Sequence, residues 1–186
     1  MVKKALVLIA EGTEEMECVI SVDVLRRAGV EVTLAGIAGN DPVKCSRNVV
    51  VVPDSSLCDA TSKGPYDAIV LPGGLGGSKA FAECKELGQL LKEQETAGRI
   101  VAAICAAPTA LNAHSIALGK SITSYPSVEA QVMQNAKYNY KTDSVVVDGN
   151  LTTSRGPGTA FQFALSLAEQ LTGKEKATEV AKAMLL

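Results

Sequence analysis

Residues 99–114 read RIVAAICAAPTALNAH, and three local signals in this stretch meet at Cys105. The run Ile100–Ile104 is apolar without polar alternation, which is typical of a strand buried on both faces of a parallel sheet. Pro108 is well placed for the first turn of a helix that begins within a few residues. The sequence therefore predicts that Cys105 lies at a sharp turn from strand to helix.

Small residues surround this cysteine, with Ala103 and Ala107 at the positions where the nucleophile elbow of hydrolases carries glycines. Backbone N–H groups and the positive end of a helix dipole stabilise negative charge at such a turn. This predicts a thiolate with a pKa of about 3.5 to 7.5 instead of about 8.5. A buried structural cysteine is the alternative from these residues alone, because free cysteine is among the most buried residue types.

The composition of the chain narrows its class. Its 186 residues are 47% hydrophobic and 20% charged, with no linker-like segment, which predicts one globular domain over residues 1–186. No apolar run approaches the roughly 20 residues of a membrane span. The net charge of -2 argues against nucleic-acid binding, because the chain has no excess of positive charge to attract phosphate groups. Two lysines and an apolar run in Met1–Ala10 resemble a signal peptide superficially, but Glu11 follows at once, so we interpret this segment as the first strand.

The cysteine spacing predicts reduced thiols in a cytoplasmic compartment. The number is odd and no C-x-x-C pair occurs, which argues against a disulfide framework and against a zinc site. The five residues are Cys18, Cys45, Cys58, Cys84 and Cys105.

Strand and helix signals alternate along the chain. The clear strand signals are Ala5–Ile9, Val30–Ile37, Ala68–Leu71 and Ile100–Ile104. The clear helix signals are a segment from a Thr13 cap to Ala28, then Lys85–Ala97, Ala160–Leu171 and Lys174–Leu186. Weaker signals predict an antiparallel pair of Val43–Cys45 with Val49–Val52, a strand at Ser121–Ser124, a helix at Val128–Met133, and a hairpin of Val145–Val147 with Leu151–Thr153. This order predicts an α/β fold with an open, mostly parallel sheet and helices on both faces.

Ligands of such sheets bind at the carboxyl ends of the strands, so we expect the loops after Ile9, Leu71 and Ile104 to share one edge. Gly73 and Gly74 follow the third strand, and their N–H groups, together with that of Ala106, are candidates for an oxyanion site. A tight turn that merely requires glycine is the equally simple alternative.

Glu17 is the first residue on one face of the first helix, and the residues that follow it on this face, as far as Ala28, are apolar. Its carboxyl is therefore expected to face the sheet. Burial would raise its pKa and keep it protonated, and it would then donate a hydrogen bond to a nearby thiolate. The alternative is an ordinary glutamate of the first helical turn, like its neighbours Glu14 and Glu15.

The single histidine, His114, lies nine residues after Cys105, about 13 Å along a helix axis. It is therefore a poor candidate for a base, and we expect a helix-surface or interface residue. A dinucleotide site is also disfavoured, because Gly156-Pro157-Gly158 lacks the third glycine of the fingerprint and its proline lacks an N–H. We expect no cofactor and no metal.

Four motifs together resemble the ThiJ/PfpI superfamily and, within it, the animal protein deglycases. They are EGTEEME at 11–17, VLPGG at 70–74, AICAAPT at 103–109 and TSRGPGT at 153–159. The resemblance covers essentially the whole chain. It implies a flavodoxin-like sandwich, a homodimer, an oxidation-sensitive Cys105 and Glu17 as its protonated partner.

The resemblance also assigns residues outside these motifs. Cys45 matches a second, dimer-associated redox cysteine, and Arg47 matches an arginine near the site. Val52 stands where the family has a further cysteine. Tyr125 replaces a histidine of the family's Thr-Thr-His-Pro run, which leaves it as a candidate hydrogen-bond donor.

Two functions follow as hypotheses. In the first, Cys105 and Glu17 hydrolyse methylglyoxal or its early adducts on protein amines, as a glyoxalase or deglycase. In the second, Cys105 is a redox sensor whose sulfinic acid signals to partners or controls a chaperone activity on client proteins. The resemblance implies protection against oxidative and carbonyl stress, in the cytoplasm and also in the nucleus and mitochondrion.

Overall fold

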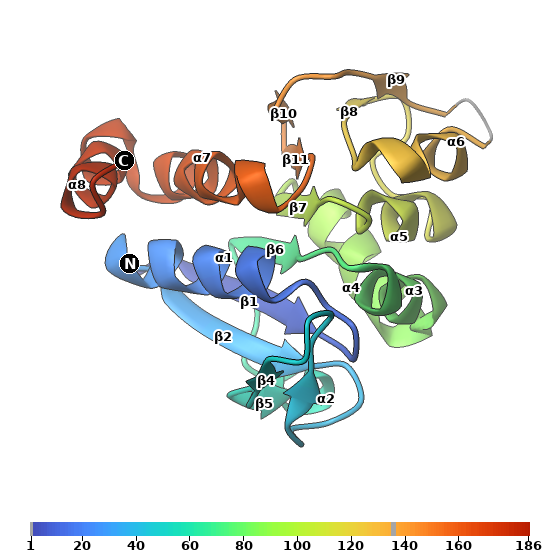
Figure 1. The fold of residues 1–186 in the computed structure, drawn as a ribbon, viewed down its shortest axis with the longest axis horizontal. Coiled ribbons are helices and arrows are strands. Elements are labelled where there is room, and N and C mark those ends of the chain that lie inside the picture. Colours follow the sequence, from blue (N-terminus) through green and yellow to red (C-terminus); the bar gives the residue numbers. More distant parts are fainter. Residues whose placement is uncertain (1, 135–136) are drawn as a thin grey trace.

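The computed structural model describes residues 2–134 and 137–186, and a seven-stranded sheet forms its centre (Figure 1). The strand order is β10-β11-β7-β6-β1-β2-β5. The bounds are Lys4–Ile9 for β1, Glu31–Gly36 for β2, Ser55–Ser56 for β5, Ala68–Leu71 for β6, Ile100–Ile104 for β7, Val145–Asp148 for β10 and Leu151–Ser154 for β11. All neighbours pair in parallel except β10 and β11, which form an antiparallel hairpin.

The five principal strands, taken in chain order, are arranged 2-1-3-4-5, which is the flavodoxin-like order. The predicted α/β fold with a mostly parallel sheet is therefore confirmed. In this order the chain reverses direction across the sheet between β1 and β6. Ligands of open α/β sheets bind outside the carboxyl ends of the strands at such a switch point.

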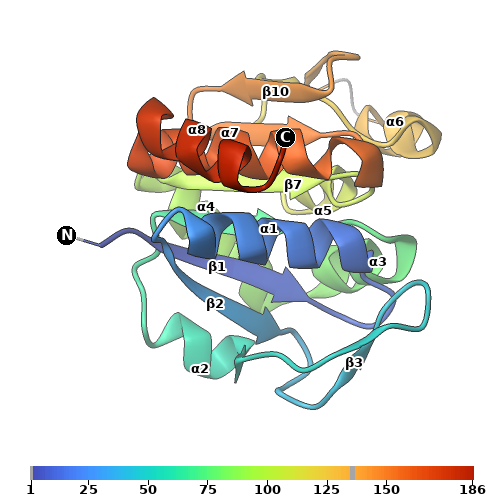
Figure 2. The ribbon, with the colours of Figure 1, turned by 60° about the vertical axis from the view of Figure 1, so that its left-hand side comes forward.

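Helices cover both faces of the sheet (Figure 2). On one face lie α1 (Glu15–Arg27), α7 (Ala160–Thr172) and α8 (Lys174–Ala183), and α7 contacts the other two. On the other face lie α3 (Leu75–Glu83), α4 (Lys85–Thr96) and α5 (Pro108–Ala113), and α3 contacts both of its neighbours. The short helix α2 (Leu57–Thr61) packs at the edge, against β2 and β5.

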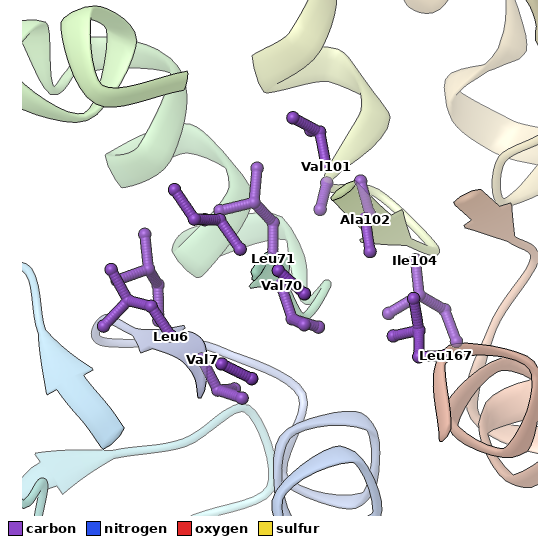
Figure 3. Close-up of a cluster of buried hydrophobic side chains, with 14 of the residues drawn as sticks. Leu6, Val7, Val70, Leu71, Val101, Ala102, Ile104 and Leu167 are labelled. Carbon is purple, nitrogen blue, oxygen red and sulfur yellow. The ribbon is translucent and has the colours of Figure 1, made fainter. Parts of the chain in front are cut away.

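The core lies between the sheet and these helices. Val7, Val70 and Ile104, on three neighbouring strands, are fully buried, and Leu167 of α7 lies beside Ile104 (Figure 3). Apolar runs without alternation are what a strand covered on both faces requires. The interpretation of Ile100–Ile104 as a central buried strand is confirmed.

Several short elements differ from the sequence prediction. The strand at Ser121 is only β8 (Ser121–Ile122), and it pairs with the unpredicted β9 (Asn139–Tyr140). The predicted helix at Val128–Met133 is a 3-10 turn at Pro126–Val128 followed by α6 (Glu129–Val132). The antiparallel pair is confirmed as β3 (Val43–Lys44) with β4 (Val50–Val51). Among the described residues, no helix has the length and apolar character needed to cross a bilayer.

Candidate active site

The carboxyl ends of β1, β6 and β7 meet at one edge of the sheet, as the sequence predicts. The segment from Ala10 to Glu14 follows β1, Pro72–Gly74 follows β6, and Cys105 follows β7. This edge includes the switch point between β1 and β6. The candidate residues on three separate segments are thereby brought together.

Cys105 forms the predicted sharp turn. Its φ is 65°, in the left-handed region that non-glycine residues seldom adopt. Its N–H donates to the Ser154 carbonyl at 3.0 Å, and its own carbonyl accepts the Tyr125 N–H at 2.8 Å. The next two residues, Ala106 and Ala107, are buried. Contacts on both sides therefore hold the backbone in a strained conformation, as is common at functional turns.

The start of α1 places Glu17 and corrects the predicted cap. Thr13 is not the N-cap, because its hydroxyl is buried and accepts the Ala10 N–H at 3.0 Å, within the loop before the helix. Glu14 is the N-cap, and its carboxylate accepts the Glu17 N–H at 2.8 Å. The helix consequently begins at Glu15, and Glu17 lies in its first turn.

Glu17 faces the sheet and is fully buried, as predicted. Its Oε2 accepts the Gly73 N–H at 2.6 Å. Its Oε1 is buried and has no partner of good hydrogen-bond geometry among the described residues, although the Cys105 thiol is close enough to interact with the carboxyl. Burial raises the pKa of Glu17 to about 7, against the opposing effect of the Gly73 hydrogen bond. This carboxyl can both accept and donate a proton near neutral pH.

Gly73 has a different role from the one expected. Its N–H is engaged by Glu17, so it orients the carboxyl and does not face a substrate oxygen. A Cβ at this position would lie 2.5 Å from the Cys105 Cβ and 2.6 Å from Glu17 Oε2, which only glycine avoids. The N–H groups of Gly74 and Ala106 hydrogen-bond toward the Cys105 sulfur and lower its pKa. They remain the candidates for an oxyanion site.

The predicted low pKa of Cys105 is wrong for the resting thiol. Burial, followed by the charge of Glu17, raises the pKa of the thiol to about 12, and the Gly74 and Ala106 amides offset only part of this. In the resting pair the sulfur keeps its proton, and Glu17 is the group that titrates near neutral pH.

A pocket of about 520 Å³ opens over the sulfur. Five predicted site residues line it: Arg47, Gly74, Cys105, Ala106 and Tyr125, the last of which is 45% exposed. The other lining residues were not predicted as site residues. They are Gly12, Glu14, Ser46, Leu75, Gly76, Ser127 and Pro157. Most lie within or beside the quoted motifs, but chain position alone does not show which side chains face the cavity.

Glu15 holds the β3–β4 hairpin against this pocket. Its two carboxylate oxygens accept the Ser46 hydroxyl at 2.7 Å and the Arg47 N–H at 2.8 Å. Burial acts to raise the pKa of Glu15, but these hydrogen bonds outweigh it and lower the pKa. Arg47 thus reaches the pocket because a carboxylate of α1 fixes its backbone.

Two other candidates lie outside the pocket lining. Cys45 is buried at the end of β3, and burial with the charges of Glu15 and Glu14 raises its pKa to about 11. His114 ends α5, with its Nε2 2.8 Å from the Phe81 carbonyl. It is half-buried, with its ring against α3, and it does not line the pocket. The described residues contain no cluster of three or more His, Cys, Asp or Glu side chains suited to a metal ion.

Comparison with known proteins agrees with the geometry. Residues 3–170 match the model of the DJ-1/PfpI family. The chain is 57% identical to the protein dj-1beta of Drosophila melanogaster over 187 residues, covering 100% of this chain and 98% of that protein. It is 51% identical to the Parkinson disease protein 7 homolog of Danio rerio, covering 99% and 97%. It is also 42% identical to the glutathione-independent glyoxalase DJR-1.2 of Caenorhabditis elegans, covering 99% and 97%.

Solved structures give the same result. The crystal structure of Drosophila melanogaster DJ-1beta superposes with a TM-score of 0.97 at 56% identity, covering 100% of this chain and 99% of that one. The oxidized DJ-1 of Toxoplasma gondii superposes with a TM-score of 0.92 at 36% identity, covering 99% and 98%. The resemblance indicated by the four sequence motifs is confirmed.

Proposed function

The chain belongs to the DJ-1/PfpI family, and from this premise we propose that it protects against carbonyl and oxidative stress by hydrolysing α-oxoaldehydes. The substrates are methylglyoxal and its early adducts on protein amines. One observation carries the proposal: a buried carboxyl with a pKa of about 7 adjoins the only cysteine that lines the pocket among the described residues. The glyoxalase name of the Caenorhabditis elegans relative supports it.

The first chemical step is addition of sulfur to the aldehyde carbon. The Glu17 carboxylate accepts the thiol proton as the C–S bond forms, so a free thiolate is not required beforehand. The aldehyde oxygen becomes an anion, and the N–H groups of Gly74 and Ala106 are available to stabilise it. Protonated Glu17 then supplies the proton that gives the neutral hemithioacetal.

The second step is an internal redox reaction. The hydrogen of the former aldehyde carbon leaves as a proton and returns to the adjacent carbonyl carbon through an enediol. The first carbon is thereby oxidised to a thioester and the second is reduced to an alcohol. Water then adds to the thioester, the C–S bond breaks, the sulfur regains a proton and lactate leaves. Glyoxal gives glycolate by the same sequence, and no external reductant is consumed.

The decisive experiment measures lactate formed from methylglyoxal by the parent protein and by Cys105→Ala. We expect the variant to lose the activity while retaining its folded circular-dichroism spectrum. Lactate formation at the parental rate by Cys105→Ala would rule out the mechanism.

Sensing by oxidation is the second candidate. One molecule of hydrogen peroxide oxidises the Cys105 thiol to sulfenic acid and releases water, and a second oxidises the sulfenic acid to sulfinic acid and releases another water. The same two amides are available as donors to the new oxygens, and partner or client proteins would recognise the oxidised form. Mass spectrometry during peroxide titration tests this candidate. Oxidation of Cys105 no faster than that of Cys18 or Cys84 would exclude it.

The assembly we propose is a homodimer. Met16 and Val19 of α1, together with Val50 and Val52 of the β3–β4 hairpin, expose half or more of their side chains, which supports a self-complementary apolar face. Sedimentation of the parent protein and of Val50→Asp measures the oligomeric state. Cytoplasmic location, with nuclear and mitochondrial pools, remains a prediction from the family.

A further inference from the structure

The motif TSRGPGT at 153–159 has no part in the mechanism proposed above. It joins the end of β11 to the start of α7, and β11 lies beside β7, the strand that leads to Cys105 (Figure 1). In the register of this parallel pair Ser154 lies opposite Ile104, the residue before the cysteine. The motif therefore begins next to the strained turn.

Two backbone hydrogen bonds hold the Cys105 turn. The Cys105 N–H donates to the Ser154 carbonyl, and the Tyr125 N–H donates to the Cys105 carbonyl. A non-glycine residue keeps a left-handed conformation only where the surrounding structure imposes it. The positions of Ser154 and Tyr125 therefore decide the direction in which the Cys105 side chain points.

The Thr159 hydroxyl fixes the segment that contains Ser154. Its Oγ1 accepts the Arg155 N–H at 3.2 Å and the Gly156 N–H at 3.1 Å. It lies 2.7 Å from the Ser154 Oγ, which donates its own proton to the Ser144 carbonyl at 2.6 Å. Because the Ser154 hydroxyl has only one proton, the Thr159 hydroxyl is the donor between the two side chains. The Gly156 carbonyl, at 3.0 Å, is the more distant acceptor for that proton.

The position of Thr159 at the start of α7 does not account for this hydroxyl. Threonine at an N-cap usually accepts a hydrogen bond from an N–H of the first helical turn. The structure describes all of α7 and shows no such bond to the Thr159 side chain. The hydroxyl points back to the residues before the 3-10 turn Pro157–Thr159, so its role lies at the end of β11.

The same motif fixes the segment that leads to Tyr125. The Thr153 Oγ1 accepts the Thr123 N–H at 3.0 Å. The Arg155 guanidinium donates to the Thr123 Oγ1 at 3.2 Å. Thr123 and Thr153 are fully buried, so water does not compete for these bonds. Both backbone partners of the Cys105 turn therefore depend on residues of this motif.

We propose that Thr159 is a positioning residue for the Cys105 nucleophile. Its hydroxyl fixes the Ser154 carbonyl, and this carbonyl holds the turn that directs the sulfur toward the Glu17 carboxyl. Thr159 is not among the described residues that line the pocket, so it acts only through the turn. The inference rests on the proposed function, because it concerns the same cysteine.

The test measures the rate at which iodoacetamide labels Cys105 from pH 5.5 to 9.5, which reports on the sulfur without turnover. In the parent protein we expect the rate to rise with a midpoint of about 7, because Glu17 accepts the thiol proton once it is ionised. Thr159→Val removes the hydroxyl and keeps the branched shape. It should lower the rate at pH 7.5 by at least about tenfold, part of the 10²- to 10⁴-fold that a positioned base contributes. Its midpoint should move to about 8.5 or above, as for a thiol without a base.

Thr159→Ser restores the hydroxyl and should recover the parental rate and midpoint. Thr172→Val is the matched control, because the Thr172 hydroxyl donates to the Ala168 carbonyl at the other end of α7. It should change neither quantity, although it also removes a hydroxyl that is hydrogen-bonded to the backbone. Ser154→Ala removes the other side chain of the contact and should reproduce the shift, so it carries the test if Thr159→Val does not fold.

A parental rate and midpoint in both folded Thr159→Val and Ser154→Ala would overturn the inference. Equal losses in Thr159→Val and Thr172→Val would also overturn it, because they would show a general effect on stability. If the parent protein forms no lactate from methylglyoxal while the labelling pattern is as expected, the positioning role stands and the proposed function fails.

Discussion

Cys105 and Cys45 each follow directly after a strand, yet their surroundings differ. Cys105 follows β7 and is 8% exposed, whereas Cys45 follows β3 and is 4% exposed. Burial raises the pKa of both thiols. At Cys105 the charge of Glu17 raises the pKa further and two backbone amides oppose the rise, whereas at Cys45 the other influences are the charges of Glu15 and Glu14, which raise the pKa further.

The comparison shows that two buried thiols, both with a raised pKa, differ in the groups that surround the sulfur. A negative charge that develops on Cys105 meets two N–H donors and a carboxyl that can hold the displaced proton. A negative charge on Cys45 would meet only other negative charges, while the Cys45 N–H is used in the hairpin, where it donates to Val49 at 2.8 Å. The hairpin contributes to the site through Arg47 and Ser46, which line the pocket. A redox role for Cys45 itself remains a prediction.

The largest expected effect is the difference in alkylation rate between these two cysteines. The resting pKa of Cys105 is not the lower of the two, but Cys105 lines the pocket beside a carboxyl with a pKa of about 7 that can accept its proton during the reaction, whereas Cys45 lies outside the pocket lining. Such general base assistance corresponds to roughly 10²- to 10⁴-fold in rate. We expect iodoacetamide to label Cys105 faster than Cys45 by this factor, measured by peptide mass spectrometry over time. Comparable rates would mean that neither the pocket nor the Glu17 carboxyl distinguishes the two sites, and the comparison would fail.

Glu17→Gln tests the proton acceptor. The amide cannot take the thiol proton, so we expect kcat with methylglyoxal to fall by about 10²- to 10³-fold, within the range for general base catalysis. Glu15→Gln is the matched control on the same helix turn, because Glu15 contacts Ser46 and Arg47 and not Cys105. It should alter KM more than kcat. An unchanged kcat in Glu17→Gln would remove the carboxyl from the mechanism.

The same two glutamates should affect stability with opposite dependence on pH. The pKa of Glu17 is raised from 4.5 to about 7, so between these values the folded protein holds a proton that the unfolded chain releases. Stability should therefore fall as pH rises through this window, by at most about 3 kcal/mol. The pKa of Glu15 is lowered, so its contribution is lost only as pH falls through the acid range.

Urea unfolding from pH 4.5 to 8 measures this dependence. The decrease should be absent in Glu17→Gln and retained in Glu15→Gln. A parental slope in Glu17→Gln would show that the buried carboxyl does not cause it.

The parts of the fold that the sequence predicts well are those where one physical signal dominates. Uninterrupted apolar runs predict β1, β6 and β7, and small residues predict the turn at Cys105. Helix α3 was missed because its sequence begins Leu-Gly-Gly, and glycine is a poor helix former. Packing explains why it forms: a Cβ at Gly77 would lie 2.4 Å from the Thr13 hydroxyl, so the close approach to the β1 loop requires glycine there.

The sequence predicted which residues form the site better than it predicted what each residue does. Position after a strand identified Cys105, Gly73 and Gly74, and helical periodicity identified Glu17. The roles depend on which donor reaches which acceptor in three dimensions. The Gly73 N–H bonds to Glu17, and burial prevails over the amides at Cys105, two outcomes that depend on distances between segments far apart in the chain.

The smallest effect is expected at Tyr125. This residue lines the same pocket as Cys105, so it tests a second group beside the reactive sulfur. Its backbone N–H donates a hydrogen bond to the Cys105 carbonyl. The residue is 45% exposed, and its ring lies close to Gly156. A neutral hydroxyl that donates to substrate contributes about 0.5 to 1.5 kcal/mol, which is roughly two- to tenfold in rate. We expect Tyr125→Phe to lower kcat/KM for methylglyoxal by this amount. Tyr138→Phe is the control, because that hydroxyl donates to the Ile116 carbonyl outside the pocket lining. A loss in Tyr125→Phe as large as that in Glu17→Gln would show that the tyrosine does more than donate one neutral hydrogen bond and would contradict this assignment.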